Sequence, residues 1–247
     1  MKVEDINPYG EGADKSSQVE RMFDTIAPAY DFMNNAMTFG MYRSWRNKAL
    51  KAAIQSLGYN PGRVLDVATG TGDVAFTLSK LLPETDITGI DISEGMLSIA
   101  RKKLSGLPPE TQKRMAFGKG DTLMLPFLDG EFDLVTVAYG IRNFSDLRRG
   151  VAEMKRVLKT GGVLCIIELS CPTGKFTRAG YDFYSKKIIP FAGKLISGDS
   201  RAYSYLPESI AACPQREDMA ALLTSAGFIK VEWKSLTFGA VTYYLAR

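Results

Sequence analysis

The stretch VLDVATGTGDVA, residues 64–75, decides the fold of this chain. RVLDVA (63–68) is a short apolar run typical of a buried strand, and DVAFTLSKLL (73–82) has the apolar spacing of a helix. Between them stands Gly70-x-Gly72-x-x-Ala75, a turn whose glycines let a ligand approach the backbone. A strand, a glycine turn and a helix in this order form the first unit of an α/β domain with a mostly parallel sheet.

The same alternation continues along the chain. Further strands are predicted at DITGID (86–91), RMAFGKGD (114–121), FDLVTVAYG (132–140) and VLCIIEL (163–169). Helices are predicted at 93–106, at 146–159 before Thr160-Gly161-Gly162, and at 218–227. The last strands, FIKVEW (228–233) and TYYLAR (242–247), are joined by SLTFGAV, which leaves no room for a crossover helix. We therefore expect an antiparallel hairpin at one edge of the sheet.

The segment before residue 58 differs from this pattern. Residues 1–14 are polar, and we expect a frayed end there. VERMFDTI (19–26) repeats apolar residues at helical spacing, Pro28 is expected to end that run, and Gly58 is expected to cap the next helix. We expect a single structural domain in two parts: a helical cap or lid at 1–57 and a Rossmann-like ligand-binding part at 58–247, with an insertion at about 172–212.

Composition excludes several classes of protein. Three cysteines without a CxxC pair, in a chain without histidine, argue against a zinc site and a disulfide scaffold, so no metal is expected and a reducing intracellular compartment fits. No signal peptide is recognisable, and no stretch approaches about 18 uninterrupted apolar residues. The net charge of +4 is too modest for a typical nucleic-acid-binding protein.

Carboxylates surround the glycine turn and help to choose its ligand. The turn, with Asp91 ending the next strand 21 residues after Gly70, satisfies the dinucleotide fingerprint. A dinucleotide would place a diphosphate at the positive end of the following helix. Asp66 and Asp73 flank that position, and no lysine or arginine lies between Arg63 and Lys80. Two acids beside a diphosphate would repel it.

The same acids suit a ligand with cationic groups and no phosphate. S-adenosylmethionine is such a ligand, because it carries an ammonium group and a sulfonium. Asp91 could accept both ribose hydroxyls, and Asp121, at the end of a third strand, suits the adenine amino group. Capping of helices and turns is the alternative for any one acid, Asp73 above all. It accounts poorly for Asp66, Asp91 and Asp121 together, since open α/β sheets bind ligands at the carboxyl ends of their strands.

Several blocks make the resemblance specific. The chain resembles class I S-adenosylmethionine-dependent methyltransferases and, more narrowly, the ubiquinone/menaquinone biosynthesis C-methyltransferase family. The blocks are YDFMNNAMTFGMYRSWR (30–46), VLDVATGTGD (64–73), GIDISEGMLSIA (89–100), GDTLMLPFLDGEFDLVTVAYGIRNFSD (120–146), RVLKTGGVLCIIELSCP (156–172) and IPFAGKLISGDSRAYSYLPESIAACP (189–214). The family usually has His-Arg where this chain has Tyr42-Arg43, which puts in doubt any role that needs a histidine there.

The resemblance implies a fold, a reaction and a set of cofactor residues. The fold is a seven-stranded, mostly parallel sheet with an antiparallel last strand. The reaction moves a methyl group from S-adenosylmethionine to a ring carbon of a polyprenylated quinol, and we favour demethylmenaquinol, which gives menaquinol. The residues expected at the cofactor are Asp66, Thr69, Gly70, Thr71, Gly72, Asp73, Asp91, Ile92, Met96, Asp121, Thr122 and Ala138.

The stretch LVTVAYGIRNFSD (134–146) brings Arg142 and Asn143 to the carboxyl end of a strand. An arginine is a poor proton acceptor but a good partner for an anionic ring oxygen. We expect Arg142 to lower the pKa of a quinol hydroxyl and hold its oxyanion, Asn143 to orient a hydroxyl, and Tyr139 or Tyr42 to relay the proton. A structural ion pair from Arg142 to Asp146 or Asp73 is the alternative.

Two aromatic segments are candidates for the substrate side. In 22–46 we expect both core packing and a lid over an apolar ring and prenyl tail, with Tyr30, Met33 and Met37 in the pocket beside Tyr42. Residues 181–197 could line the same pocket or form a core helix pair. Between Lys175 and Arg201 six basic residues stand against two acids, which suits contact with anionic lipid. The protein is thus expected to be cytoplasmic, at the inner face of the membrane.

Other functions remain open at this point. A nicotinamide-dependent reductase and a non-enzymatic quinone-binding assembly partner are disfavoured by the acids at the turn and by the intact cofactor blocks. Methylation of 2-polyprenyl-6-methoxy-1,4-benzoquinol on the ubiquinone pathway, or use of both quinols, is not separated from the menaquinone reaction by these residues. Nor do they fix the oligomeric state, and a homodimer is compatible with them.

Overall fold

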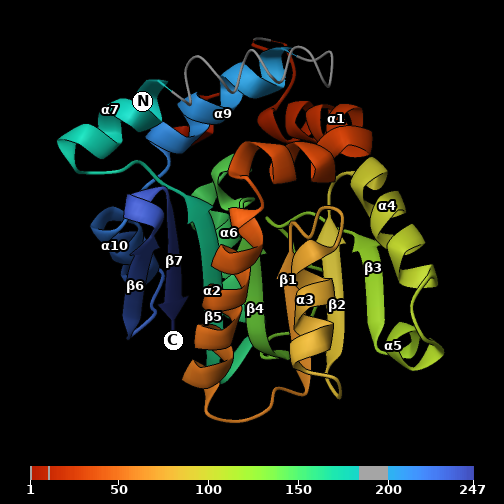
Figure 1. Ribbon diagram of the computed structural model, residues 1–247. Helices are drawn as coiled ribbons and strands as arrows, with labels where there is room; N and C mark the ends of the chain where they lie inside the picture. The colour runs from red at the N-terminus through yellow and green to blue at the C-terminus, as the bar shows by residue number, and fades with distance from the viewer. Residues whose placement is uncertain (1, 11, 184–199) are drawn as a thin grey trace.

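The computed structural model describes residues 2–10, 12–183 and 200–247 (Figure 1). Within these residues a seven-stranded sheet has the order β3-β2-β1-β4-β5-β7-β6. The strands are β1 (Arg63–Val67), β2 (Asp86–Asp91), β3 (Met115–Lys119), β4 (Phe132–Ala138), β5 (Leu158–Leu169), β6 (Val231–Leu236) and β7 (Val241–Ala246). β1 to β5 pair in parallel, and β7 runs antiparallel to both β5 and β6. The expected sheet and its closing hairpin are confirmed.

Helices cover both faces of the sheet (Figure 1). On one face α2 (Met41–Leu57) and α3 (Asp73–Leu81) bury side chains such as Leu50 and Leu78 against Val64 and Leu134. On the other face lie α6 (Leu147–Val157) and α10 (Glu217–Ser225). Helix α4 (Glu94–Ser105) and the short α5 (Pro109–Lys113) flank β3. Burying apolar side chains on both faces leaves the strand ends as the place for a ligand.

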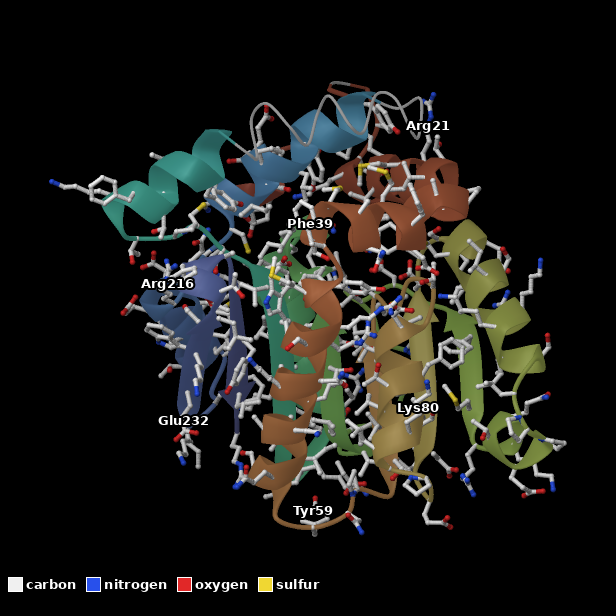
Figure 2. All side chains as sticks on the ribbon, viewed as in Figure 1. Arg21, Phe39, Tyr59, Lys80, Arg216 and Glu232 are labelled. Carbon is white, nitrogen blue, oxygen red and sulfur yellow. The ribbon has the colours of Figure 1, made fainter. Side chains whose placement is uncertain are left out.

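A further layer lies over the carboxyl ends of the strands. It contains α1 (Lys15–Thr38), α7 (Lys175–Phe183) and α9 (Ser200–Ala212), at the top of Figure 1. Phe39, where α1 passes into α2, lies on this side of the molecule, and Tyr59 lies at the opposite end of α2 (Figure 2). Most of the segment 181–197 lies outside the described residues, so the expectations for it stay predictions.

Helix α1 does not end at Pro28 as expected. It runs unbroken from Lys15 to Thr38 with Pro28 inside it. A proline removes one helical hydrogen bond and crowds the preceding turn. Buried Met22 and Ile26 before the proline and buried Met33 after it share one apolar cluster. Tertiary packing of both halves therefore outweighs the local cost of the proline.

Two other expectations about local structure were wrong. The N-terminal residues are not frayed, because Val3 and Ile6 are buried and the side chain of Lys15 donates a hydrogen bond to the Val3 carbonyl. Helix α6 ends at Val157, earlier than the glycines suggested, since Leu158 already pairs with Phe132 at the start of β5. Both differences arise from contacts between segments far apart in the sequence, which local patterns do not reveal.

Candidate active site

Two adjoining cavities open between the strand ends and the helical layer. The strand-end cavity is lined by Ser16, Val19, Phe23, Tyr30, Ala68, Gly70, Asp91, Ile92, Met96, Asp121, Thr122, Leu123, Ala138, Tyr139, Gly140, Asn143, Phe144 and Ser145. The aromatic cavity is lined by Met22, Phe23, Ile26, Tyr30, Met33, Asn34, Met37, Thr38, Tyr42, Trp45, Tyr139, Arg142, Leu169, Tyr205 and Leu206. With the space open to solvent their volumes are about 690 and 790 Å³, the size of small-molecule sites. Phe23, Tyr30 and Tyr139 belong to both.

The glycine turn forms one wall of the strand-end cavity. Gly70 and Gly72 have φ values of 57° and 85°, in the left-handed region that favours glycine. A Cβ on Gly72 would lie 2.7 Å from the ring of Phe76 and 3.0 Å from that of Phe117. The turn is therefore tight because of the packing behind it, and it leaves the backbone at Gly70 next to the cavity.

Asp91 lies at the carboxyl end of β2, on the floor of the strand-end cavity. Its carboxylate accepts hydrogen bonds from the backbone N–H of Gly70 (2.7 Å) and of Ser93 (2.9 Å). Burial raises the pKa of Asp91, although these backbone hydrogen bonds oppose the shift. Each carboxylate oxygen keeps further acceptor capacity, so Asp91 is fixed in place and can still bind two hydroxyls.

The expected cofactor residues divide into two groups. Those that line the strand-end cavity are Gly70, Asp91, Ile92, Met96, Asp121, Thr122 and Ala138. Those that do not line it are Asp66, Thr69, Thr71, Gly72 and Asp73. Asp66 is 1% exposed, accepts hydrogen bonds from the hydroxyls of Thr69 (2.6 Å) and Thr136 (2.7 Å), and has its pKa raised to about 6 by burial. It supports the turn from below.

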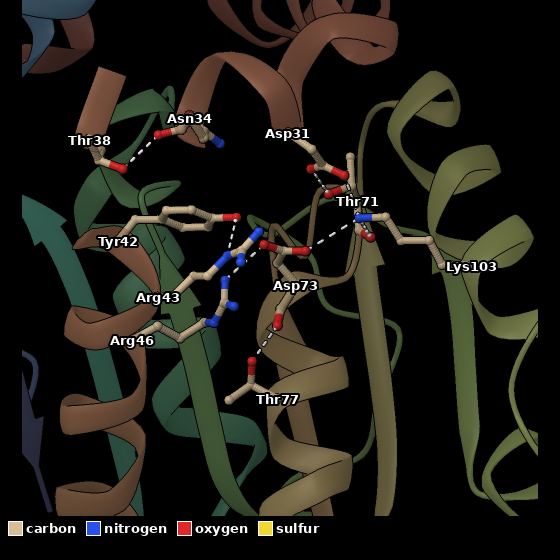
Figure 3. Close-up of polar contacts among 10 residues, drawn as sticks. All are labelled: Asp31, Asn34, Thr38, Tyr42, Arg43, Arg46, Thr71, Asp73, Thr77 and Lys103. Carbon is tan, nitrogen blue, oxygen red and sulfur yellow. Dashed lines mark hydrogen bonds and ion pairs between the residues drawn. The ribbon is translucent and has the colours of Figure 1, made fainter. Parts of the chain in front are cut away.

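Asp73 has cationic partners that local sequence did not reveal (Figure 3). Arg46 of α2 pairs with its carboxylate at 2.8 Å, and Lys103 of α4 approaches at 3.3 Å. Burial alone would raise the pKa of Asp73, but these two cations outweigh it and lower the pKa. The absence of basic residues between 63 and 80 therefore does not mean that the turn lacks positive charge.

Helix α1 is fastened over the strand-end cavity by three of its carboxylates. Asp31 accepts the Thr71 hydroxyl (2.6 Å) and pairs with Lys103 (2.6 Å), as Figure 3 shows. Asp24 accepts the Ser93 hydroxyl at 2.6 Å and the Gly95 N–H at 2.9 Å.

The third carboxylate is that of Glu20, which pairs with Lys119 at 2.6 Å. The three contacts fall near the carboxyl ends of β1, β2 and β3, so α1 covers the cavity along its length.

The aromatic cavity contains the expected substrate residues Tyr30, Met33, Met37 and Tyr42. Sequence reasoning did not place the remaining lining residues in this cavity: the other side chains from α1, Trp45 from α2, Leu169 at the end of β5, and Tyr205 and Leu206 from α9. Met22, Phe23 and Ile26 belonged to the recognised helical stripe, but helical spacing alone does not separate a cavity wall from a core contact. Tyr42 accepts a hydrogen bond from Arg43 at 3.3 Å.

Tyr139 stands between the two cavities. Its φ is 58°, an uncommon conformation for a residue with a large side chain. Its buried hydroxyl has no hydrogen-bond partner among the described residues. Burial and the nearby carboxylate of Glu168 raise its pKa. A buried hydroxyl without a partner is costly, so a polar ligand atom at the junction would satisfy it.

Arg142 lines the aromatic cavity and is paired with Glu168 of β5. The Arg142 Nη1 to Glu168 Oε1 distance is 2.8 Å, and the two side chains are 8% and 4% exposed. The same Nη1 also donates to the Tyr139 carbonyl. The alternative partners considered from sequence were wrong, because Asp146 caps α6 through the Arg149 N–H (2.9 Å) and Asp73 pairs with Arg46 and Lys103.

Asn143 lies on the strand-end side of the junction. Its Oδ1 accepts a hydrogen bond from the Tyr205 hydroxyl at 3.1 Å. Its buried Nδ2 has no partner within the part of the chain that the structure describes. With the Tyr139 hydroxyl and the Nε of Arg142, also unpartnered there, the junction of the two cavities holds three polar atoms still able to bind a ligand.

The sequence model of the ubiE/COQ5 methyltransferase family matches residues 12–247. A demethylmenaquinone methyltransferase of Bacteroides fragilis is 46% identical over 245 residues, 98% of this chain and 97% of that protein. One of Deinococcus radiodurans is 41% identical, covering 97% and 96%. A ubiquinone/menaquinone biosynthesis C-methyltransferase of Geobacter sulfurreducens is 42% identical, covering 94% and 88%.

Solved structures agree on the fold. An S-adenosylmethionine-dependent methyltransferase of Thermotoga maritima, described as a possible histamine N-methyltransferase, has a TM-score of 0.62 at 20% identity and covers 92% of this chain and 98% of its own. The cyclase SpnF has a TM-score of 0.65 at 21% identity, covering 91% and 76%. A methyltransferase and a cyclase thus share the fold, which alone does not fix the reaction. The match along the sequence does more: this chain belongs to the ubiE/COQ5 methyltransferase family.

Proposed function

We propose that this member of the ubiE/COQ5 methyltransferase family methylates a ring carbon of demethylmenaquinol and so forms menaquinol. The observation that carries the proposal is the junction of the two cavities at Phe23, Tyr30 and Tyr139. A cavity with carboxylates at strand ends touches one lined mostly by apolar and aromatic side chains. This arrangement suits a methyl donor on one side and a quinol ring with an apolar tail on the other.

S-adenosylmethionine, when bound, supplies the electrophilic methyl group. The strand-end cavity fits it by its donor set: Asp91 offers acceptors to ribose hydroxyls, Asp121 and Thr122 lie where an adenine edge would bind, and Gly70 and Ala138 leave backbone exposed. Five other residues of the turn region do not line this cavity and support the turn from its far side: Asp66, Thr69, Thr71, Gly72 and Asp73. In this proposal they shape the site and give no direct contact.

The chain's part in the chemistry is to hold the quinol and stabilise its oxyanion. Arg142 faces the aromatic cavity, and its guanidinium would bind the ring oxygen as negative charge grows there. Asn143 would orient a hydroxyl through its unpartnered Nδ2, and the Tyr139 hydroxyl would donate to a ring oxygen. Tyr42 lies farther along the cavity, where it contacts the ring or relays a proton through water.

Helix α1 provides the lid. Its side chains line both cavities, and the carboxylates of Glu20, Asp24 and Asp31 fasten it to the cofactor side. We propose that residues 1–57 serve partly as this cover, although α2 also packs on the sheet. Excluding water strengthens the electrostatic contacts at the junction.

We also propose that the protein is cytoplasmic and meets the membrane with the end that carries α1. No helix in the described residues is long and apolar enough to cross a bilayer. Phe39 and Phe238 are 82% and 83% exposed, and helix α2, which begins two residues after Phe39, is joined to the residue before Phe238 by a hydrogen bond from Trp45 to Thr237 (2.8 Å). Phe39 lies at the α1–α2 junction (Figure 2), close to Thr38 and Tyr42 of the aromatic cavity.

Liposome flotation tests the membrane contact. Binding to vesicles with anionic lipid, weakened by Phe39→Ser with Phe238→Ser, is expected. The control is Tyr59→Ser, which changes an exposed tyrosine at the opposite end of α2 and should bind vesicles as the wild type does. If the protein shows no lipid-dependent binding in this assay, the proposed membrane contact is contradicted.

The substrate is tested by a methyl-transfer assay. Purified protein, labelled S-adenosylmethionine and chemically reduced demethylmenaquinone with a short prenyl tail should give labelled menaquinone, separated by chromatography. The methoxybenzoquinol of the ubiquinone pathway is the second candidate, because relatives such as that of Geobacter sulfurreducens carry both pathways in their name. Labelling of the benzoquinol alone would reverse the assignment, and labelling of both would indicate dual use.

A further inference from the structure

The side chain of Tyr205 joins the two cavities through Asn143. Tyr205 comes from α9 and lines the aromatic cavity, whereas Asn143 lies in the turn after β4 and lines the strand-end cavity. The Tyr205 hydroxyl donates a hydrogen bond to Asn143 Oδ1 at 3.1 Å, and both residues are buried. The two positions lie 62 residues apart, so no short motif reveals the contact.

The ring of Tyr205 is held in place by helix α1. It belongs to the buried apolar cluster that contains Met22, Ile26 and Met33. A tyrosine side chain has only two torsion angles, so the packing of its ring also fixes the position of its hydroxyl. The hydroxyl therefore meets Asn143 from a rigid position, set by the helix that covers both cavities.

The hydrogen bond determines which atom of the Asn143 amide is left for a ligand. An amide side chain carries one acceptor oxygen and one NH₂ donor group. Burial raises the pKa of Tyr205 to about 12, so its hydroxyl keeps its proton at neutral pH and can donate. Since Oδ1 is occupied, the group still able to bind is the buried Nδ2, which has no partner among the described residues. Asn143 thus offers a donor to the junction of the cavities.

A donor at this position suits the proposed reaction better than an acceptor. Negative charge grows on the quinol oxygen as the ring carbon attacks the methyl group, and fixed donors that point at such a charge stabilise the transition state. An amide oxygen in the same position would repel the charge. A side chain that keeps the amide in the productive orientation therefore favours the reaction, even where it does not touch the reacting atoms.

We propose that Tyr205 is a positioning residue that holds the Asn143 amide so that its Nδ2 is available to the quinol oxygen. The inference rests on the proposed function. It gives α9, part of the segment expected as an insertion, a role in the rate of the reaction as well as in the shape of the aromatic cavity. Without the Tyr205 hydroxyl, Oδ1 loses its donor, the amide is free to rotate, and Nδ2 is no longer fixed.

A double-mutant cycle on the full-length protein separates this role from packing. Tyr205→Phe removes the hydroxyl and keeps the ring in its apolar cluster. For reduced demethylmenaquinone, kcat should fall by about tenfold while KM stays within about twofold, because the contact strengthens in the transition state. Asn143→Ala should lower kcat by about 10²-fold. In the Asn143→Ala background, Tyr205→Phe should change kcat by no more than about twofold, because the group through which it acts is gone.

Binding of a nitronaphthol that is ionised at neutral pH gives a second measurement, independent of turnover. Its oxygen only accepts hydrogen bonds, and its absorbance follows binding. Tyr205→Phe should weaken this binding by about tenfold, and should leave it unchanged in the Asn143→Ala background. The matched control is Tyr244→Phe, which removes a buried hydroxyl that accepts from the Arg216 N–H (2.7 Å) outside both cavities. In that variant turnover and affinity should stay at the wild-type values.

The outcomes decide between the possible roles of Tyr205. Loss of its effect in the Asn143→Ala background, in turnover and in binding, supports the proposal. An effect that persists there in either measurement would mean that Tyr205 acts by packing or by touching the quinol itself. A rise in KM with unchanged kcat would mean that it only binds the substrate. Each of these results, or a Tyr205→Phe variant equal to the wild type, overturns the proposal.

Two further provisions keep the test decisive. If Asn143→Ala does not fold, Asn143→Leu, which has a similar volume to asparagine and no polar atom, takes its place in the cycle with the same expectations. A wild-type protein that methylates no quinol would refute the proposed function, and the nitronaphthol cycle would still decide whether Tyr205 positions Asn143.

Discussion

The strand-end cavity and the aromatic cavity share three side chains, but the chain builds them in different ways. The first is made largely by turns that directly follow β1, β2 and β3, with Gly70, Asp91 and Asp121 at successive strand ends. The second is made by side chains from α1, α2, the turn after β4, and α9. A ligand bound by strand ends depends on short contiguous motifs, whereas a ligand bound between helices depends on packing. Substitutions should therefore divide cleanly into binding effects on one side and rate effects on the other.

Arg142→Lys should give the largest effect. A lysine lacks the planar fork that can hold Glu168 and a ring oxygen together. We expect kcat to fall by about 10²- to 10³-fold, the usual consequence of losing one oxyanion donor. Calorimetry should show S-adenosylmethionine affinity within about twofold of wild type, because Arg142 does not line the strand-end cavity. Arg63→Lys, which alters an ion pair with Glu131 outside both cavities, is the control. Unchanged turnover in the Arg142 variant would remove the arginine from the mechanism.

The buried carboxyl group of Asp66, which supports the glycine turn of the strand-end cavity, should make the stability of the protein depend on pH. Burial raises its pKa from 3.8 to about 6, so the folded protein binds this proton more tightly than the unfolded chain does. The stabilisation is complete below about pH 4 and is lost as the pH rises through about 6. A shift of this size corresponds to roughly 2–3 kcal/mol. Thermal unfolding followed against pH should show this loss in the wild type and a flatter profile in Asp66→Asn. An identical slope in both would contradict the assigned pKa.

The division between the cavities also explains what sequence could predict. The strands, the antiparallel hairpin and Asp91 follow from motifs of a few residues, and so does the placement of Arg142 at a strand end. The partners of Arg142 and Asp73 could not be predicted from such motifs, because Glu168, Arg46 and Lys103 lie 26 to 30 positions away and on other elements. The spacing of apolar residues along the sequence does not show which buried charged side chains form ion pairs. The prediction that the helix ends at Pro28 was wrong for a related reason, since only the buried cluster around it shows why the helix continues.

Asp91→Asn should change binding more than rate. An amide keeps the shape but replaces a charged acceptor with one neutral oxygen and a donor, so the hydrogen bonds proposed from the ribose hydroxyls to Asp91 would be weakened or lost. Each bond to a charged group contributes about 1.5–3 kcal/mol. We expect the dissociation constant of S-adenosylmethionine to rise by about 10- to 100-fold, while kcat at saturating donor stays within a few-fold. Calorimetry and steady-state kinetics measure the two separately. A fall in kcat with unchanged affinity would undo the proposed division of labour.

Asp31→Ala should have the smallest effect, and it tests how far the two cavities are independent. Asp31 ties α1 to Thr71 and Lys103, but its side chain is 39% exposed and that of Lys103 is 31% exposed, so solvent screens the pair. Such pairs contribute about 0.2–1 kcal/mol. The dissociation rate of S-adenosylmethionine, measured by stopped flow, should rise by no more than about fivefold, and the difference from the wild type should shrink at high salt, which screens the pair in the wild type. Glu94→Ala, which removes an exposed pair with Arg101 on α4, should leave that rate unchanged. If Asp31→Ala lowered kcat as strongly as Arg142→Lys, closure of α1 would control the chemistry itself, and the two cavities would have to be treated as one site.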